Sequence, residues 1–136
     1  MNIYTFTPIF LRFSLSASYL SAVADRFGLW GAPGAEGVFW GNFQNFNAYT
    51  QTLNPLLPEL MVLPLSWFVT ILEIVLGILL IFNIRSKEVG YTSAGLLALF
   101  AIAMIANLGL KAPLDYSVLT ACAASLALAN FNPKTT

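Results

Sequence analysis

The chain has 136 residues, of which 58% are hydrophobic and 9% are charged. Soluble domains carry about 25% charged residues, so this composition predicts a protein that lies mainly in lipid. The formal net charge of zero argues against a nucleic-acid partner, and the lack of histidine with a single cysteine, Cys122, excludes histidine-ligated haem, zinc sites and intramolecular disulfides.

The first predicted membrane span covers residues 8–24. Pro8 suits a first helical position, and Asp25-Arg26 directly after the apolar run is expected to end the helix. An alternative is a signal peptide, because residues 22–24 (Ala-Val-Ala) have the small-x-small form of a cleavage site. No Lys or Arg precedes the apolar run, which favours the membrane span.

Polar residues inside this first span are the first candidates for a binding site. Arg12, Ser16 and Tyr19 follow helical spacing and therefore share one side of the helix. Serine and other small residues also serve close packing of membrane helices, and an arginine one turn into the membrane can extend its charge to the lipid headgroups. Both structural explanations stand beside the functional one.

Residues 27–62 form a long connection rich in glycine and aromatic residues. Within it, helical spacing relates five residues, namely Phe39, Phe43, Phe46, Thr50 and Leu53. This pattern predicts a short amphipathic helix on the membrane surface, with Trp30 and Trp40 as interfacial anchors. The segment is expected either to close one end of a helix bundle or to cover a lipophilic pocket.

The second predicted span, residues 64–84, contains one charged residue, Glu73, near its middle. About 21 helical residues rise about 31 Å, which matches the hydrocarbon core of a bilayer. A carboxylate at that depth costs about 2.5 to 3.5 kcal/mol, so it should face protein or water and mark a functional site. Ser66, Thr70 and Gly77 extend a polar and small stripe along the face of Glu73.

Two further apolar runs predict a third span at residues 90–110 and a fourth at residues 114–129. The predicted fold is therefore all-α: a single integral membrane domain over residues 1–136, built as a four-helix bundle with a short interfacial helix in the first connection. Basic residues are slightly more frequent on the side of the two termini, which predicts that both termini of this multi-pass protein are cytoplasmic in a bacterial inner membrane. The residues that decide this bias are Arg12, Arg85, Lys87 and Lys134 against Arg26 and Lys111.

Arg12 and Glu73 are the two charges expected within the membrane, and whether they meet is open. In antiparallel helices their side chains lean apart, so a direct pair needs a deeper first helix or an intervening water. If they do not meet, Glu73 is expected to be protonated. Either state can hydrogen-bond a ligand carbonyl or hydroxyl, with Ser16, Tyr19 and Thr70 as further ligand-binding candidates. Alternatively, these residues only hold the helices together.

These residues resemble the DoxX/DoxD-like family of small four-helix membrane proteins. The resemblance rests on Leu11-Arg12, Asp25-Arg26-Phe27, the aromatic connection, Leu72-Glu73 followed by Gly77, and Arg85. The chain departs from the family pattern at Arg26, where lysine is common, and at Leu76 and Asn83, where glycine is frequent. The resemblance implies a subunit of a thiosulfate:quinone oxidoreductase-like system, with Arg12 and Glu73 as the functional pair.

The leading functional hypothesis is a subunit of a quinone-linked redox system that binds a lipophilic ligand, with quinone as the candidate cofactor, between its helices. A second hypothesis is a non-catalytic scaffold that recruits soluble redox enzymes to the bilayer, and a third is a small transporter. No catalytic residue and no metal site is predicted. The sequence leaves open whether the protein is an enzyme, what its ligand and protein partners are, and how many copies assemble.

Overall fold

The computed structural model describes residues 2–131, and within them it contains helices and no strand. The predicted all-α class is thus confirmed for the described part of the chain. Lys134, which enters the orientation argument, lies outside that part. The helices are α1 (Ile3–Arg26), α2 (Phe43–Leu53), α3 (Glu59–Ile81), α4 (Ser86–Leu108), α5 (Lys111–Asp115) and α6 (Val118–Asn130).

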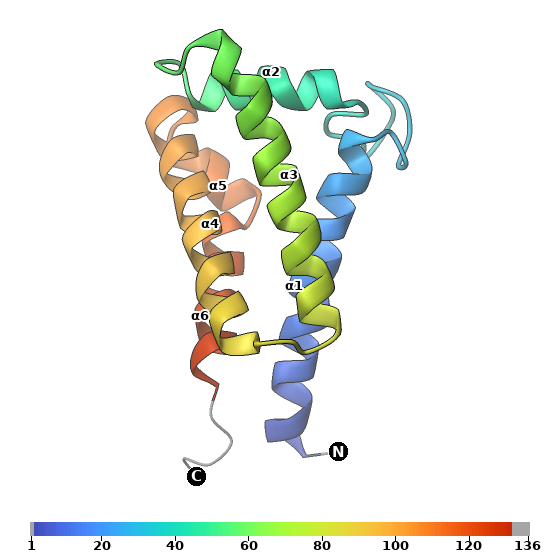
Figure 1. Ribbon diagram of the computed structural model, residues 1–136, viewed down its shortest axis with the longest axis vertical. Helices are drawn as coiled ribbons and strands as arrows, with labels where there is room; N and C mark the ends of the chain where they lie inside the picture. The colour runs from blue at the N-terminus through green and yellow to red at the C-terminus, as the bar shows by residue number, and fades with distance from the viewer. Residues whose placement is uncertain (1, 132–136) are drawn as a thin grey trace.

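The long axis of the molecule is followed by α1, α3, α4 and α6, and α2 lies across one end of them (Figure 1). α1 packs mainly on α3, and α4 packs mainly on α6, so the long helices form two pairs. The first and last described residues lie together at the end opposite α2 (Figure 1). Both ends of the described chain therefore lie on the same side of the helices.

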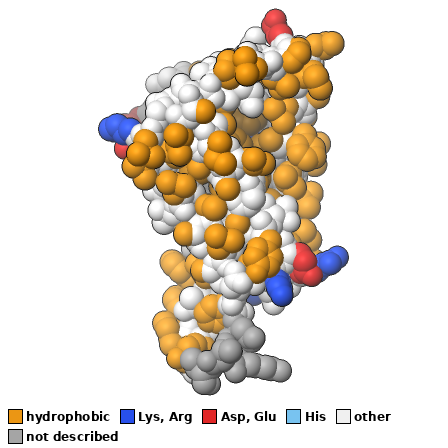
Figure 2. All heavy atoms as spheres, turned by 90° about the vertical axis from the view of Figure 1, so that its left-hand side faces the viewer, with side chains coloured by type: hydrophobic (Ala, Val, Ile, Leu, Met, Phe, Trp, Pro, Cys, Tyr) orange, Lys and Arg blue, Asp and Glu red, His pale blue; other side chains and the backbone are white. Residues whose placement is uncertain are grey.

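Among residues 2–131, α3 and α4 are long and apolar enough to cross a membrane. α6 is apolar but has only 13 residues, and α1 carries Arg12, Asp25 and Arg26 among several serines. Figure 2 shows one face of the molecule, on which apolar side chains fill a broad band between charged groups near its upper and lower parts. Two of the predicted spans thus meet the length and composition of a membrane helix, and the complete four-span bundle stays a prediction.

The fourth predicted span is wrong as a continuous helix over residues 114–129. α5 ends at Asp115 and α6 begins at Val118. Ser117, which lies between the two helices, has a left-handed backbone conformation with φ 56°. A left-handed residue breaks the i to i−4 ladder of backbone hydrogen bonds. The break coincides with the polar residues Asp115, Tyr116 and Ser117, which the prediction placed at the start of the span.

The predicted helix starts at Pro8 and Pro64 are also wrong, because both helices begin more than one turn earlier. The side chain of Asn2 accepts a hydrogen bond from the Tyr4 backbone N–H and caps α1, and α3 starts directly after Pro58. Proline inside a helix removes one backbone hydrogen bond, a cost that is limited near the start of a helix. The earlier starts lengthen both helices towards the span of a bilayer.

The predicted amphipathic helix of the first connection is confirmed as α2. Its buried side, formed by Phe46, Thr50 and Leu53, faces α3 and α4. The role assigned to Trp40 is wrong, however, because its indole packs inward against Arg26 and its Nε1 atom is buried. Trp30 is 63% exposed, which is compatible with the interfacial role expected of it.

Candidate functional site

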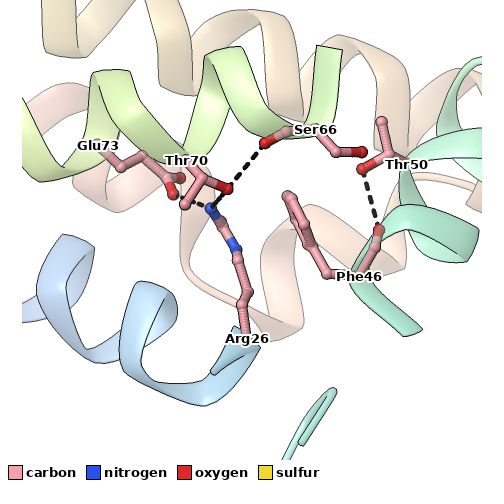
Figure 3. A network of polar contacts seen from close by, with 6 residues as sticks. All are labelled: Arg26, Phe46, Thr50, Ser66, Thr70 and Glu73. Atoms are coloured by element: carbon pink, nitrogen blue, oxygen red, sulfur yellow. Dashed lines mark hydrogen bonds and ion pairs between the residues drawn. The ribbon is translucent and has the colours of Figure 1, made fainter. Parts of the chain in front are cut away.

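A buried ion pair joins the end of α1 to the middle of α3. Arg26 Nη1 lies 2.5 Å from Glu73 Oε2, and the two side chains are 2% and 6% exposed. Arg26 Nη1 also donates a hydrogen bond of 2.9 Å to Thr70 Oγ1, and the Thr70 hydroxyl donates to the Ser66 carbonyl oxygen at 2.8 Å (Figure 3). The guanidinium is therefore held by two side chains one helical turn apart on α3.

The direction of helical side chains explains why Arg26 is the partner of Glu73. Helical side chains lean towards the N-terminus of their own helix. Arg26 at the C-terminal end of α1 thus leans back into the molecule, while Glu73 on antiparallel α3 leans towards the end where Arg26 lies. Side chains that lean towards each other can close the vertical offset between their backbones, which two that lean apart cannot.

Aromatic rings cover the remaining side of the guanidinium. The Cζ atom of Arg26 lies 3.7 Å from the ring centroid of Phe46 and 5.2 Å from that of Trp40. Both distances fall within the range of cation–π attraction, which is strongest where water is excluded. Phe46 lies on α2, so the helix that crosses the end of the molecule also seals the ion pair.

The neighbouring residue, Asp25, fixes the loop that carries Trp40. Its carboxylate accepts hydrogen bonds from the backbone N–H groups of Phe39 at 2.8 Å, Trp40 at 3.2 Å and Gly41 at 2.9 Å. Bonds from backbone N–H groups to an ionised carboxylate are stronger than neutral ones. Asp25 therefore serves as a local brace that sets the position of the Trp40 ring against Arg26.

Arg12 lies elsewhere, at the C-terminal end of α3. Its Nε donates to the Leu80 carbonyl oxygen at 3.0 Å, and its Nη2 donates to the Ile81 carbonyl oxygen at 3.4 Å. The last carbonyl groups of a helix lack helical partners and carry partial negative charge, which a cation satisfies. The hypothesis of an Arg12–Glu73 pair is therefore wrong, because Glu73 pairs with Arg26 and Arg12 caps α3.

The other predicted ligand-binding residues, Ser16, Tyr19 and Thr70, each have a hydrogen-bond partner within the protein. Ser16 is buried and donates to the Gly77 carbonyl oxygen at 2.8 Å, which ties α1 to α3. The Tyr19 hydroxyl lies 2.5 Å from Ser93 Oγ on α4, and Tyr19 also lines a cavity together with Glu73. Thr70 is bonded to Arg26. Ligand binding by any of these residues stays a prediction.

Two neighbouring cavities border the ion pair. The lower one, about 350 Å³, is lined by Tyr19 and Glu73 among mainly apolar residues of α1, α4 and α6. The inner one, about 240 Å³, lies beneath α2 and is lined by Arg26, Trp40 and Tyr49 in addition to Glu73. The residues that line both cavities are Ala22, Glu73, Leu97, Tyr116 and Val118.

The inner cavity is also lined by the hydroxyl-bearing side chain of Tyr49. Burial, and to a smaller degree the nearby Tyr116, raises the pKa of the Tyr49 hydroxyl, so this group stays protonated at physiological pH.

A separate groove of about 460 Å³, lined mostly by apolar residues of α3 and α4, shares Phe46 and Phe100 with the inner cavity. Within residues 2–131, no group of three metal-binding side chains comes together.

Arg26 is the functional candidate that sequence reasoning missed, since it was interpreted as a signal that ends the helix. The spacing of buried residues in α1, however, indicates that Arg26 points into the molecule. Tyr19, Val23 and Arg26 follow each other at four and three residues and therefore lie on one helix face, and all three are buried. A cation that continues a buried face, one turn past the apolar run, indicates a side chain that points inward.

One comparison with known proteins assigns a family. The model of a family described as methylamine utilisation protein MauE matches residues 27–115, which is more than half of the chain. The matched region contains α2, α3, α4 and Glu73, and it starts directly after Arg26. This match contradicts the resemblance to the DoxX/DoxD-like family, which is wrong as a family assignment. No curated protein and no solved structure matches the chain significantly.

Proposed function

The chain belongs to the MauE family of membrane proteins, and from this premise we propose that it is a membrane component of methylamine utilisation that binds a neutral lipophilic molecule between its helices. The ligand class is a quinone or a similar ring with a hydrogen-bonding head group. In this proposal the protein is a multi-pass protein of the bacterial inner membrane with both termini cytoplasmic, and its partners are other subunits of a redox complex.

The observation that carries the proposal is the buried Arg26–Glu73 pair beside two adjoining cavities, both of which are lined by Glu73. Ligand sites are mostly apolar cavities with a few convergent polar groups. The two cavities fit this description, because the ion pair supplies the polar groups and the surrounding side chains are mainly aliphatic or aromatic.

The charge of the site favours a neutral ligand. Arg26 and Glu73 neutralise each other at 2.5 Å, so neither a free cation nor a free anion finds an unpaired countercharge there. Transfer of a charged ligand into this interior would cost several kcal/mol of desolvation without such a partner. An uncharged ring with oxygen substituents avoids that cost and still finds hydrogen-bonding atoms.

The groove between α3 and α4 offers room for an apolar tail. Its polar lining residues, Thr50 and Asn54, already bond to backbone oxygens of α2: Thr50 Oγ1 donates to the Phe46 carbonyl and Asn54 Nδ2 donates to the Thr50 carbonyl. The Thr50 hydroxyl and the Asn54 Nδ2 group would therefore keep these hydrogen bonds beneath a hydrocarbon tail. In this proposal the head group lies beside Glu73, and the tail passes Phe46 and Phe100 to reach the groove.

A cavity-filling variant tests the proposal without breaking the ion pair. Ala22 lines both cavities, so Ala22→Phe should fill them and weaken binding of a short-tailed quinone by about tenfold or more, as measured by quenching of tryptophan fluorescence in detergent. Ala17→Phe is the matched control, because Ala17 is exposed on the same helix and lines neither cavity.

Thermal unfolding supplies an independent measurement. A ligand at a hundredfold excess over its Kd stabilises the folded state by about 2.7 kcal/mol, so wild type and Ala17→Phe should melt at higher temperature with the quinone present. Absence of saturable quenching in folded wild type, or equal binding by Ala22→Phe, would refute the proposal. The scaffold alternative predicts stoichiometric soluble partners that persist in Ala22→Phe and no quinone binding in any variant.

A further inference from the structure

Two buried hydrogen-bond donors beside the inner cavity have no partner within residues 2–131. They are Nε of Arg26 and Nε1 of Trp40, and both residues line the cavity of about 240 Å³ beneath α2. Buried donors in folded proteins are nearly always satisfied, because an unmet donor costs about 1 to 3 kcal/mol. This side of the site therefore requires an acceptor atom that the described chain does not supply.

At the lower cavity, the Tyr19 hydroxyl offers a hydrogen-bond acceptor. The Ser125 hydroxyl donates its single proton to the Ala121 carbonyl oxygen at 2.9 Å, so it accepts from Ser93 Oγ at 2.8 Å. The Ser93 proton is thereby used, and the Tyr19 hydroxyl, 2.5 Å from Ser93 Oγ, must donate to Ser93. Tyr19 keeps only lone pairs for the lower cavity of about 350 Å³ that it lines.

The Glu73 carboxylate supplies a further hydrogen-bond acceptor. An ionised carboxylate has acceptor atoms and no donor, and Glu73 lines the lower cavity together with Tyr19. Glu73 Oε2 has its ion-pair contact to Arg26 but no hydrogen bond of good geometry within the described chain. Two unpaired donors, Nε of Arg26 and Nε1 of Trp40, thus lie at the inner cavity, the lone pairs of Tyr19 face the lower cavity, and the Glu73 carboxylate borders both.

We propose that the ligand of this site carries an acceptor oxygen at one end of its head group and a hydroxyl at the other, as a hydroquinone does. The acceptor oxygen takes hydrogen bonds from Trp40 Nε1 and Arg26 Nε, and the hydroxyl donates to Tyr19 or Glu73. This inference rests on the proposed function and narrows it, because an oxidised quinone has acceptors at both ends. The reduced form should therefore bind more tightly than the oxidised form.

A set of ring compounds with oxygen substituents at the same two positions tests this polarity under anaerobic conditions. Hydroquinone and its monomethyl ether each have a donor and an acceptor, whereas the quinone and the dimethyl ether have acceptors only. We expect the first two to bind with similar Kd and the last two about tenfold more weakly, which is about 1.4 kcal/mol. In Tyr19→Phe this discrimination should shrink, and the ratio of two Kd values within one variant does not depend on its stability.

Trp40→Phe tests the donor side because it keeps an aromatic ring and removes the N–H. The N–H has no partner in the free protein, so Trp40→Phe removes no hydrogen bond there and should lower the melting temperature only through the smaller ring against Arg26 and Phe46, while it weakens binding of every compound of the set about tenfold. Trp67→Phe is the control, since Trp67 is 42% exposed and lines neither cavity. Binding in this series is followed by calorimetry, because the variants change the tryptophan signal.

The outcomes separate this inference from the proposed function. If the four compounds bind wild type saturably with equal affinity, the lipophilic site stands and its polarity is refuted. Unchanged binding in Trp40→Phe refutes the donor role of Trp40 and, with it, the assignment of the acceptor end. If no compound binds saturably to folded wild type, both the inference and the proposed function fail.

Discussion

Asp25 and Arg26 are adjacent in the sequence, yet Arg26 turns inward to Glu73 at 2.5 Å while Asp25 turns to the backbone N–H groups of the following loop. The cation is therefore not neutralised by its neighbour, and its counterion comes from the middle of another helix. This division of roles links the loop over residues 27–42, which carries Trp40, to the buried ion pair on α3.

The brace formed by Asp25 gives a first prediction. Asp25→Asn removes the charge that strengthens three hydrogen bonds, so it should lower the free energy of unfolding by about 2 kcal/mol. Limited proteolysis should cut residues 27–42 faster than in wild type. Asp115→Asn is the control, because Asp115 pairs with Lys111 on the surface and exposed pairs contribute little. An unchanged cleavage rate in Asp25→Asn would contradict the role of the brace.

The ion pair predicts strong coupling between Arg26 and Glu73. Glu73→Leu or Arg26→Leu alone leaves one buried charge unpaired and should cost about 3 to 5 kcal/mol, measured by denaturant unfolding in detergent. The double variant leaves no buried charge, so it should be much more stable than the sum of the single effects implies. Simple additivity in this cycle would mean that the two charges do not interact.

Arg12 provides a test of the ligand-binding role expected from the sequence. Arg12→Gln removes the cation from the carbonyl groups of Leu80 and Ile81, so hydrogen exchange should accelerate in the last turn of α3. Quinone affinity should stay within a factor of about two, since Arg12 lines neither cavity. Arg12→Lys retains the charge and should show a smaller change in exchange. Loss of quinone binding with unchanged exchange would instead support a direct ligand contact.

Close packing between α4 and α6 predicts opposite effects for two glycines of one helix. A Cβ atom at Gly90 would lie 2.9 Å from Ala129 Cβ and 3.0 Å from the Ser125 carbonyl oxygen, so Gly90→Ala should destabilise the protein by about 1 to 3 kcal/mol. A Cβ atom at Gly95 meets nothing within 4 Å, and Gly95→Ala should be neutral or stabilising by up to about 1 kcal/mol. Equal melting temperatures for both variants would contradict this packing.

Much of the fold was predictable because helices follow local patterns. The apolar runs predicted α3 and α4, although α3 starts five residues before the predicted residue 64. The helical spacing that includes Phe46, Thr50 and Leu53 predicted α2, although Phe39 of that pattern lies before the helix. The break at Ser117 was missed because Asp115, Tyr116 and Ser117 were interpreted as the polar start of a span, although three polar residues in a row also fit a helix break. Helix starts at Pro8 and Pro64 failed because both helices accept proline in their second turn; Asn2 caps α1, whereas α3 begins after Pro58 without a side-chain cap.

The sequence identified the buried carboxylate of the candidate site but not the side chains that pair with it. A carboxylate inside an apolar helix needs a partner whatever the fold, so Glu73 was identified from the sequence. The choice between Arg12 and Arg26 depends on which ends of α1 and α3 are neighbours and on the direction in which each side chain leans. Trp40 was assigned to the interface because its inward position depends on a loop that Asp25 holds from 14 to 16 residues away.

The sequence by itself determined an apolar helical protein with a charged group that must be shielded, because composition and helical periodicity act through neighbouring residues. Only the tertiary structure decided that Arg26 shields Glu73, that Arg12 caps α3, and that Arg26 and Trp40 each bring an unpaired buried donor to the inner cavity. The first two of these relationships join residues more than forty positions apart, and their geometry is set by how the helices align along one another.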